Sequence, residues 1–182
     1  MNSRRYLLVL VSVLVALAGA ERVDAQTFAV KANAALYAAA TPNIGFEIVS
    51  GGRTSVDLML AGHYNPYGIG SRMIDLQGQF KYWIGGRPLV REYIGVIASA
   101  FSYDYTRKRK VHEGNAACIG VTAGYVLPLN RRWGVEFSAG VGVYAYHERK
   151  FPSGTAAPAY AGPVSLSVLP ANLGVTFIYI IR

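Results

Sequence analysis

The chain has 182 residues, of which 18 are Lys or Arg and 10 are Asp or Glu, so its formal net charge is +8. Charged residues make up 15% of the chain and hydrophobic residues 52%, whereas an ordinary soluble domain is about 25% charged. The single cysteine, Cys118, excludes a disulfide framework. The composition also excludes a disordered chain, and the length suits one domain.

Residues 1–25 are predicted to be a secretory signal peptide. Arg4 and Arg5 precede a run of Leu, Val and Ala over residues 6–18, which is shorter than the ~20 residues that a spanning helix needs. Two cleavage sites remain open, after Ala20 and after Ala25. We favour the second, which leaves residues 26–182 as one exported domain.

Residues 26–182 alternate with period two, as β-strands do. From residue 133 to 146, for example, apolar side chains alternate with mostly small or polar ones. No segment has helical periodicity. The pattern predicts an all-β chain whose eight strands form an antiparallel up-and-down transmembrane β-barrel, with strands at residues 28–38, 42–50, 54–63, 72–84, 89–102, 115–127, 133–147 and 171–181.

The connections and faces of these strands favour a membrane barrel. Tight turns are predicted at 50–53, 85–88 and 128–132, and longer connections at 64–71, 103–114 and 148–170, as in outer-membrane barrels. Small residues on the polar face suit a narrow lumen. Trp83 and Trp133, near the tight turns, are expected in an interfacial aromatic girdle. A soluble lipocalin-like barrel with the apolar face inward is the alternative.

A series of motifs along the chain resembles a Bacteroidetes family of small outer-membrane β-barrels of unknown function. In order they are KANAALY (31–37), TPNIGFE (41–47), YNP (64–66), QFKYW (79–83), RWGVE (132–136), GVYAY (142–146) and FIYII (177–181). The resemblance implies a barrel fold and an outer-membrane location. It brings no catalytic residues.

Strand parity and direction place six charged side chains in the periplasmic half of the lumen: Lys31, Glu47, Asp57, Lys81, Arg91 and Glu136. Three are positive and three are negative. Because buried charges persist when they are paired, we expect a salt-bridge plug that closes the lumen. A proton or ion relay is the alternative for these residues. Asp75 is also expected to face inward, nearer the outside.

The rim of the predicted outer loops carries a basic run, Arg107, Lys108, Arg109 and Lys110. This run is predicted to contact lipid phosphates, including those of lipopolysaccharide. The interpretation that it is a solvated loop without a partner stays equally open. Nucleic acid is not expected because no aromatic side chains interleave with these bases. His63, His112 and His147 also lie near the rim, but separate loops make a metal site a weak interpretation.

We therefore expect a monomeric, non-catalytic outer-membrane barrel with an envelope structural or surface-interaction role. It would need no cofactor, and barrel-assembly machinery would insert it into the outer membrane of a Gram-negative cell. The alternative function is a lipid-modifying hydrolase, for which His147 and Glu148 with Ser153 or Ser99 are the candidates. A soluble periplasmic ligand-binding barrel is the third interpretation.

Overall fold

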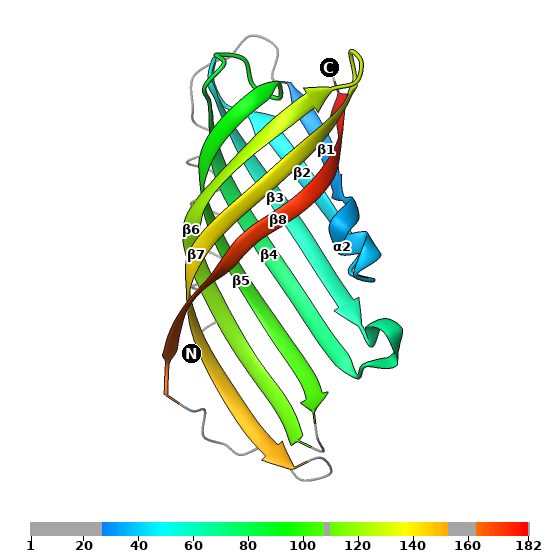
Figure 1. Ribbon diagram of the computed structural model, residues 1–182, viewed down its shortest axis with the longest axis vertical. Helices are drawn as coiled ribbons and strands as arrows, with labels where there is room; N and C mark the ends of the chain where they lie inside the picture. The colour runs from blue at the N-terminus through cyan, green and yellow to red at the C-terminus, as the bar shows by residue number, and fades with distance from the viewer. Residues whose placement is uncertain (1–26, 108–109, 153–162, 182) are drawn as a thin grey trace, which may run out of the picture.

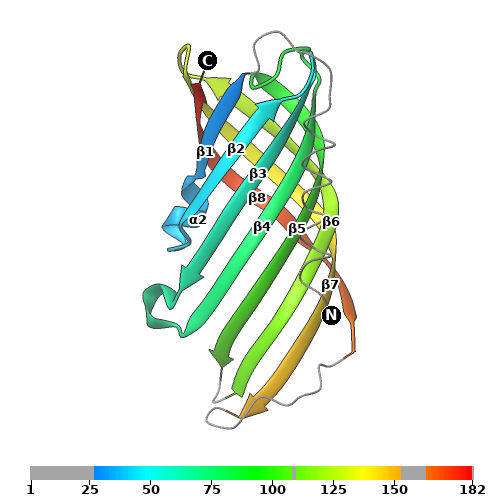
Figure 2. The ribbon, with the colours of Figure 1, turned by 180° about the vertical axis from the view of Figure 1, so that it is seen from behind.

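A computed structural model describes residues 27–107, 110–152 and 163–181. These residues form one closed barrel in which each strand pairs antiparallel with the next and β8 pairs with β1 (Figures 1 and 2). The strands are β1 Phe28–Asn33, β2 Asn43–Val49, β3 Thr54–Tyr64, β4 Ser71–Trp83, β5 Arg91–Arg107, β6 Lys110–Pro128, β7 Trp133–Pro152 and β8 Ser165–Ile181. The prediction of eight antiparallel strands in an all-β chain is confirmed.

The two ends of the barrel differ. At one end, called here the turn end, short connections at 50–53, 84–90 and 129–132 join the strands, and the start of β1 lies beside the end of β8. At the opposite end, the loop end, connections at 34–42 and 65–70 join β1 to β2 and β3 to β4. The wall is uneven, because β1 and β2 have 6 and 7 residues whereas β6 and β7 have 19 and 20 (Figure 1).

The prediction of a strand over 28–38 is wrong beyond Asn33. Residues Ala34–Ala38 form a short helix, α2, which lies against β8 (Figure 1). The side-chain oxygen of Asn33 accepts hydrogen bonds from the backbone N–H groups of Ala35 at 3.0 Å and Leu36 at 3.4 Å. This capping, followed by alanines with high helix propensity, ends the strand and starts the helix. A second short helix, η1, spans Pro66–Gly68.

Strands β5 to β8 reach farther toward the loop end than predicted. The 103–114 segment, predicted as a loop, is paired through Tyr103–Gly114 and Tyr105–His112 as a continuation of β5 and β6. In β8 the register shifts, because Val141 pairs with Pro170 and Gly140 with Asn172, which leaves Ala171 as an extra residue. Such a bulge breaks the alternation of faces, which is why the sequence pattern misses residues 165–170.

The outer surface of the barrel is apolar, whereas much of the buried interior is polar or charged. Large hydrophobic side chains from seven of the eight strands, β2 to β8, stay exposed on the outer wall, among them Ile44, Leu60, Phe80, Ile94, Val121, Phe137 and Phe177. Among the described residues, no helix has the length and apolar character that crossing a membrane requires.

Candidate functional site

Five of the six predicted lumen charges meet inside the turn-end half of the barrel. Lys31 comes from β1, Glu47 from β2, Asp57 from β3, Lys81 from β4 and Glu136 from β7. Register brings them level, since Glu47 pairs with Asp57 and Lys81 pairs with Ser55, two residues before Asp57. We call these five side chains the ionic cluster.

Each ammonium group of the ionic cluster contacts all three carboxylates. The Nζ atom of Lys31 lies 2.9 Å from Glu47 Oε2, 2.5 Å from Asp57 Oδ2 and 2.6 Å from Glu136 Oε2. For Lys81 Nζ the distances to the same three residues are 3.0, 2.9 and 3.1 Å. All five side chains are buried, so these contacts are shielded from water and from salt.

Three neighbouring side chains complete the hydrogen bonding of the ionic cluster. The hydroxyl of Ser55 donates to Glu47 Oε1 at 2.6 Å, and the indole N–H of Trp83 donates to the Ser55 oxygen at 2.8 Å. The hydroxyl of Tyr93 donates to Glu136 Oε1 at 2.6 Å. Together with the ammonium donors, these groups satisfy Glu47 and Glu136 at both oxygens, which a buried carboxylate requires.

Charge does not balance within the ionic cluster. It contains two ammonium groups and three carboxylates, and the second oxygen of Asp57, Oδ1, is buried without a hydrogen-bond partner. The excess is therefore one negative charge when all five groups are ionised. Removing a lysine should consequently destabilise the barrel more than neutralising Asp57 does.

The prediction that Arg91 belongs to this cluster is wrong. Arg91 is exposed at the turn end, where β5 begins, and its backbone has a positive φ of 66°, as does nearby Leu89 at 63°. Strand parity cannot be extended through such a turn, because left-handed residues reorient the chain. The buried residue from this turn is Leu89, not Arg91.

The assignment of Trp83 to an interfacial girdle is also wrong. Its side chain is fully buried in the lumen, whereas Trp133 is 46% exposed on the outer wall. Trp83 belongs to an apolar cluster that fills the turn end beside the ionic cluster, and its other members are Ala29, Leu89, Tyr93, Val126 and Ile178. Alternation places Trp83 on the lumen face, but the usual preference of tryptophan for interfaces points the other way.

A metal ion is not needed to hold the carboxylates together. Within the part of the chain that the structure describes, Glu47, Asp57 and Glu136 form a group whose potential ligand atoms lie within 4.8 Å of one another. Oxygens of the same three residues already accept from Lys31 and Lys81. The two ammonium groups thus occupy the place that a cation would take.

Above the ionic cluster, the middle of the lumen is filled by a mixed layer. Met59, Ile97 and Cys118 are buried there, and Gln79 donates a hydrogen bond to the Thr122 hydroxyl. Cys118 is a free, buried cysteine that packs in the interior. Nearer the loop end, Asp75 is partly buried, and its Oδ1 has no hydrogen-bond partner.

The residues predicted at the rim are only partly brought together. His112 Nδ1 lies 2.8 Å from Glu148 Oε1, and Lys150 pairs with the other oxygen of Glu148 at 2.8 Å. His147 and Glu148 are consecutive in β7, so they point to opposite faces. Ser99 of β5 pairs with Cys118 of β6, whereas His147 of β7 pairs with Asn115 of β6. Ser99 and His147 are therefore offset by three residues along the barrel wall. The predicted arrangement of His147, Glu148 and Ser99 is therefore not formed.

Part of the basic run lies outside the described residues. This applies to Lys108, Arg109, the side chain of Arg107 and also to Ser153, while Lys110 is exposed at the start of β6. Contact of this run with lipid phosphate stays a prediction.

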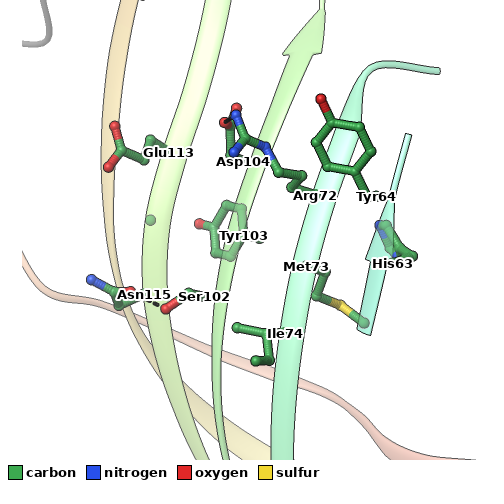
Figure 3. A pocket seen from close by; sticks show the side chains of 11 residues that line it. His63, Tyr64, Arg72, Met73, Ile74, Ser102, Tyr103, Asp104, Glu113 and Asn115 are labelled. Carbon is green, nitrogen blue, oxygen red and sulfur yellow. Dashed lines mark hydrogen bonds and ion pairs between the residues drawn. The ribbon is translucent and has the colours of Figure 1, made fainter. Parts of the chain in front are cut away.

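A hollow of about 460 Å³ lies over β3 to β6 at the loop end (Figure 3). Arg72 and Asp104 face each other across neighbouring strands at 3.5 Å, and the Arg72 guanidinium lies 5.4 Å from the ring centroid of Tyr64. Ser102 donates to Asn115 at 2.6 Å. These polar groups are exposed and pair with one another, so they contribute little to stability.

Fold and interior together define a small, closed, eight-stranded antiparallel barrel with a buried ionic cluster. The chain belongs to the family described as protein of unknown function (DUF3575), which matches residues 8–181. No curated protein and no solved structure matches it. The resemblance to a family of unknown function is thereby confirmed, while a Bacteroidetes origin stays a prediction.

Proposed function

We propose that this protein is an outer-membrane β-barrel with a closed lumen, serving a structural or surface-interaction role in the envelope of a Gram-negative cell. The observation that carries this proposal is an inverted polarity. Lys31, Lys81 and Glu136 are at most 2% exposed, whereas Ile44, Phe80 and Val121 on the outer wall are 45–60% exposed. Hydrocarbon stabilises that outer surface and water does not.

The same polarity argues against the soluble ligand-binding alternative. A soluble barrel would place its apolar face inward and expose charge to water. Here the wall would present a contiguous apolar surface that a soluble monomer rarely tolerates. The ionic cluster and the apolar cluster fill the lumen at the turn end, so this part of the barrel has no apolar cavity of the kind that a lipocalin-like barrel uses for its ligand.

The side chains that fill the lumen favour a closed barrel over an open pore. Side chains of an eight-stranded barrel are large enough to occupy its interior. The ion pair between Lys81 of β4 and Glu136 of β7 crosses the lumen, because these strands lie three places apart in the ring of eight, and Trp83 and Leu89 fill the space beside it. A continuous water path would require these buried, mutually paired charges to separate.

The location and partners follow from the proposal. An N-terminal signal peptide would deliver the chain to the periplasm, barrel-assembly machinery would insert it, and the loop end would face outward. Lipid and lipopolysaccharide would surround the wall. Their phosphate groups would contact the basic run near Lys110.

Fractionation of cells that produce the protein tests the proposal. We expect the chain in the outer-membrane fraction, extractable only with detergent. Its band should migrate faster on gels before boiling than after it, since closed membrane barrels resist unfolding by detergent. Recovery as a soluble periplasmic monomer would contradict the proposal.

A further inference from the structure

Three side chains from separate elements form a hydrogen-bonded row at the loop end. Thr41 lies just before β2, His63 is in β3 and Ser71 begins β4. The hydroxyl oxygen of Thr41 is 3.0 Å from His63 Nδ1, and His63 Nε2 is 3.1 Å from the hydroxyl oxygen of Ser71. A serine, a histidine and a group that orients the histidine therefore stand in sequence.

The second contact of the Thr41 hydroxyl sets the direction of the protons. Its hydroxyl donates to the carbonyl oxygen of Ala39 at 3.3 Å, so its oxygen is left to accept. We therefore assign the proton of neutral His63 to Nδ1, where it donates to Thr41. The bare Nε2 then accepts the proton of the Ser71 hydroxyl, which is the arrangement that activates a serine nucleophile.

His63 and Ser71 both line a cavity of about 530 Å³ inside the loop end. Most of its remaining wall is apolar or aromatic, with Met73, Phe101, Tyr144 and Leu169 among the lining residues. The rings of Phe101 and Tyr144 form a T-shaped pair with centroids 5.9 Å apart, so part of this wall is held in place. Its volume and lining suit an apolar chain, whose burial there is favourable.

We propose that Ser71 and His63 are the nucleophile and the general base of an esterase site, and that the cavity receives the acyl chain of a carboxylic ester. The Ser71 oxygen attacks the carbonyl carbon while its proton passes to His63 Nε2. The bond to the alcohol oxygen breaks, and His63 returns the proton to the leaving alcohol. Water, deprotonated by the same nitrogen, then releases the carboxylic acid and restores Ser71.

This inference goes beyond the structural role proposed above, because it assigns a catalytic activity to a barrel that the sequence predicts to be non-catalytic. The proposed nucleophile, base and positioning residue include none of the residues that the sequence indicated for a hydrolase, although Glu148 is among the residues that line the cavity. Thr41 acts as a positioning residue, because it contacts His63 and not the substrate. Its contribution is to hold the tautomer that leaves Nε2 free to accept.

Hydrolysis of p-nitrophenyl esters with acyl chains of two to twelve carbons tests the site, using the full chain in a non-ionic detergent. We expect turnover that rises with chain length until the cavity is filled. Ser71→Ala should lower kcat/KM by about a thousandfold, and His63→Gln by about a hundredfold or more. Ser102→Ala is the matched control, since Ser102 also lies at the loop end but bonds to Asn115. It should leave the rate unchanged.

Two further measurements separate catalysis from folding. An alkyl fluorophosphonate should label the wild-type chain at Ser71, as located by mass spectrometry of its peptides. Thr41→Val should lower kcat about tenfold or more by removing the orienting acceptor, and Thr41→Ser should restore it. The proposal is overturned if folded wild-type protein neither hydrolyses any ester of the series nor takes the label, or if Ser102 is labelled in place of Ser71.

Discussion

Replacing Lys31 with methionine is expected to lower the free energy of unfolding by about 3–5 kcal/mol, the usual cost of breaking a buried ion pair by removing one partner. The substitution leaves three carboxylates against the single ammonium of Lys81. Methionine fills most of the lysine volume, so the loss reports charge and hydrogen bonding. Urea titration of the protein in lipid vesicles, followed by tryptophan fluorescence, measures it.

Two controls make the interpretation of Lys31→Met specific. Asp57→Asn should destabilise the barrel by clearly less, because it removes the excess negative charge and Asp57 Oδ1 has no partner to lose. Arg91→Gln should change the stability by no more than about 0.5 kcal/mol, as exposed substitutions usually do. A loss for Asp57→Asn as large as that for Lys31→Met would contradict the charge count, and a large loss for Arg91→Gln would place that residue back in the lumen.

Replacing Trp83 with alanine is expected to cost about 3–5 kcal/mol, as large-to-small changes at buried aromatic residues do. The side chain is fully buried, its ring lies 5.0 Å from that of Tyr93, and its N–H supports Ser55 beneath Glu47. The variant therefore loses packing and also one support of the ionic cluster. The same urea titration measures the loss, with the fluorescence of Trp133 as the reporter.

Trp133→Ala is the matched control for Trp83→Ala. Trp133 lies at the same end of the barrel but on the outer wall, in contact with the ring of Tyr179 at 4.9 Å. Its loss opens no internal cavity, so the cost should be smaller. Equal losses at the two positions would argue that Trp83 is not a core residue.

Alternation along the strands made most of the ionic cluster predictable. Lys31, Glu47, Asp57, Lys81 and Glu136 each lie in a regular stretch of strand, where a side chain two residues away returns to the same face. Parity failed where the backbone leaves the β region. Arg91 itself has a positive φ at the start of β5, so counting by twos gives no face for it. In β8, Ala171 is an extra residue in a bulge, and the alternation changes phase there.

The loop-end site could not be predicted in the same way. The row of Thr41, His63 and Ser71 depends on α2 and on the turn before β4, neither of which has a period-two signal. Asn33 indicates the start of α2 through its capping role, since alanines follow it. The contact between His63 and Ser71 is set by the β3–β4 pairing, in which His63 lies opposite Met73. Without that register, no spacing in the sequence selects Ser71 over other serines.

Quenching of tryptophan fluorescence by lipids with brominated acyl chains tests most directly whether the apolar wall faces hydrocarbon and the charged face lines the lumen. The chain has two tryptophans, so Trp83→Phe leaves only the outer Trp133 and Trp133→Phe leaves only the buried Trp83. In vesicles of these lipids, we expect strong quenching of Trp133 and little quenching of Trp83. Equal or stronger quenching of Trp83 would mean that the faces are reversed, and no quenching of either would mean that the barrel does not enter the bilayer.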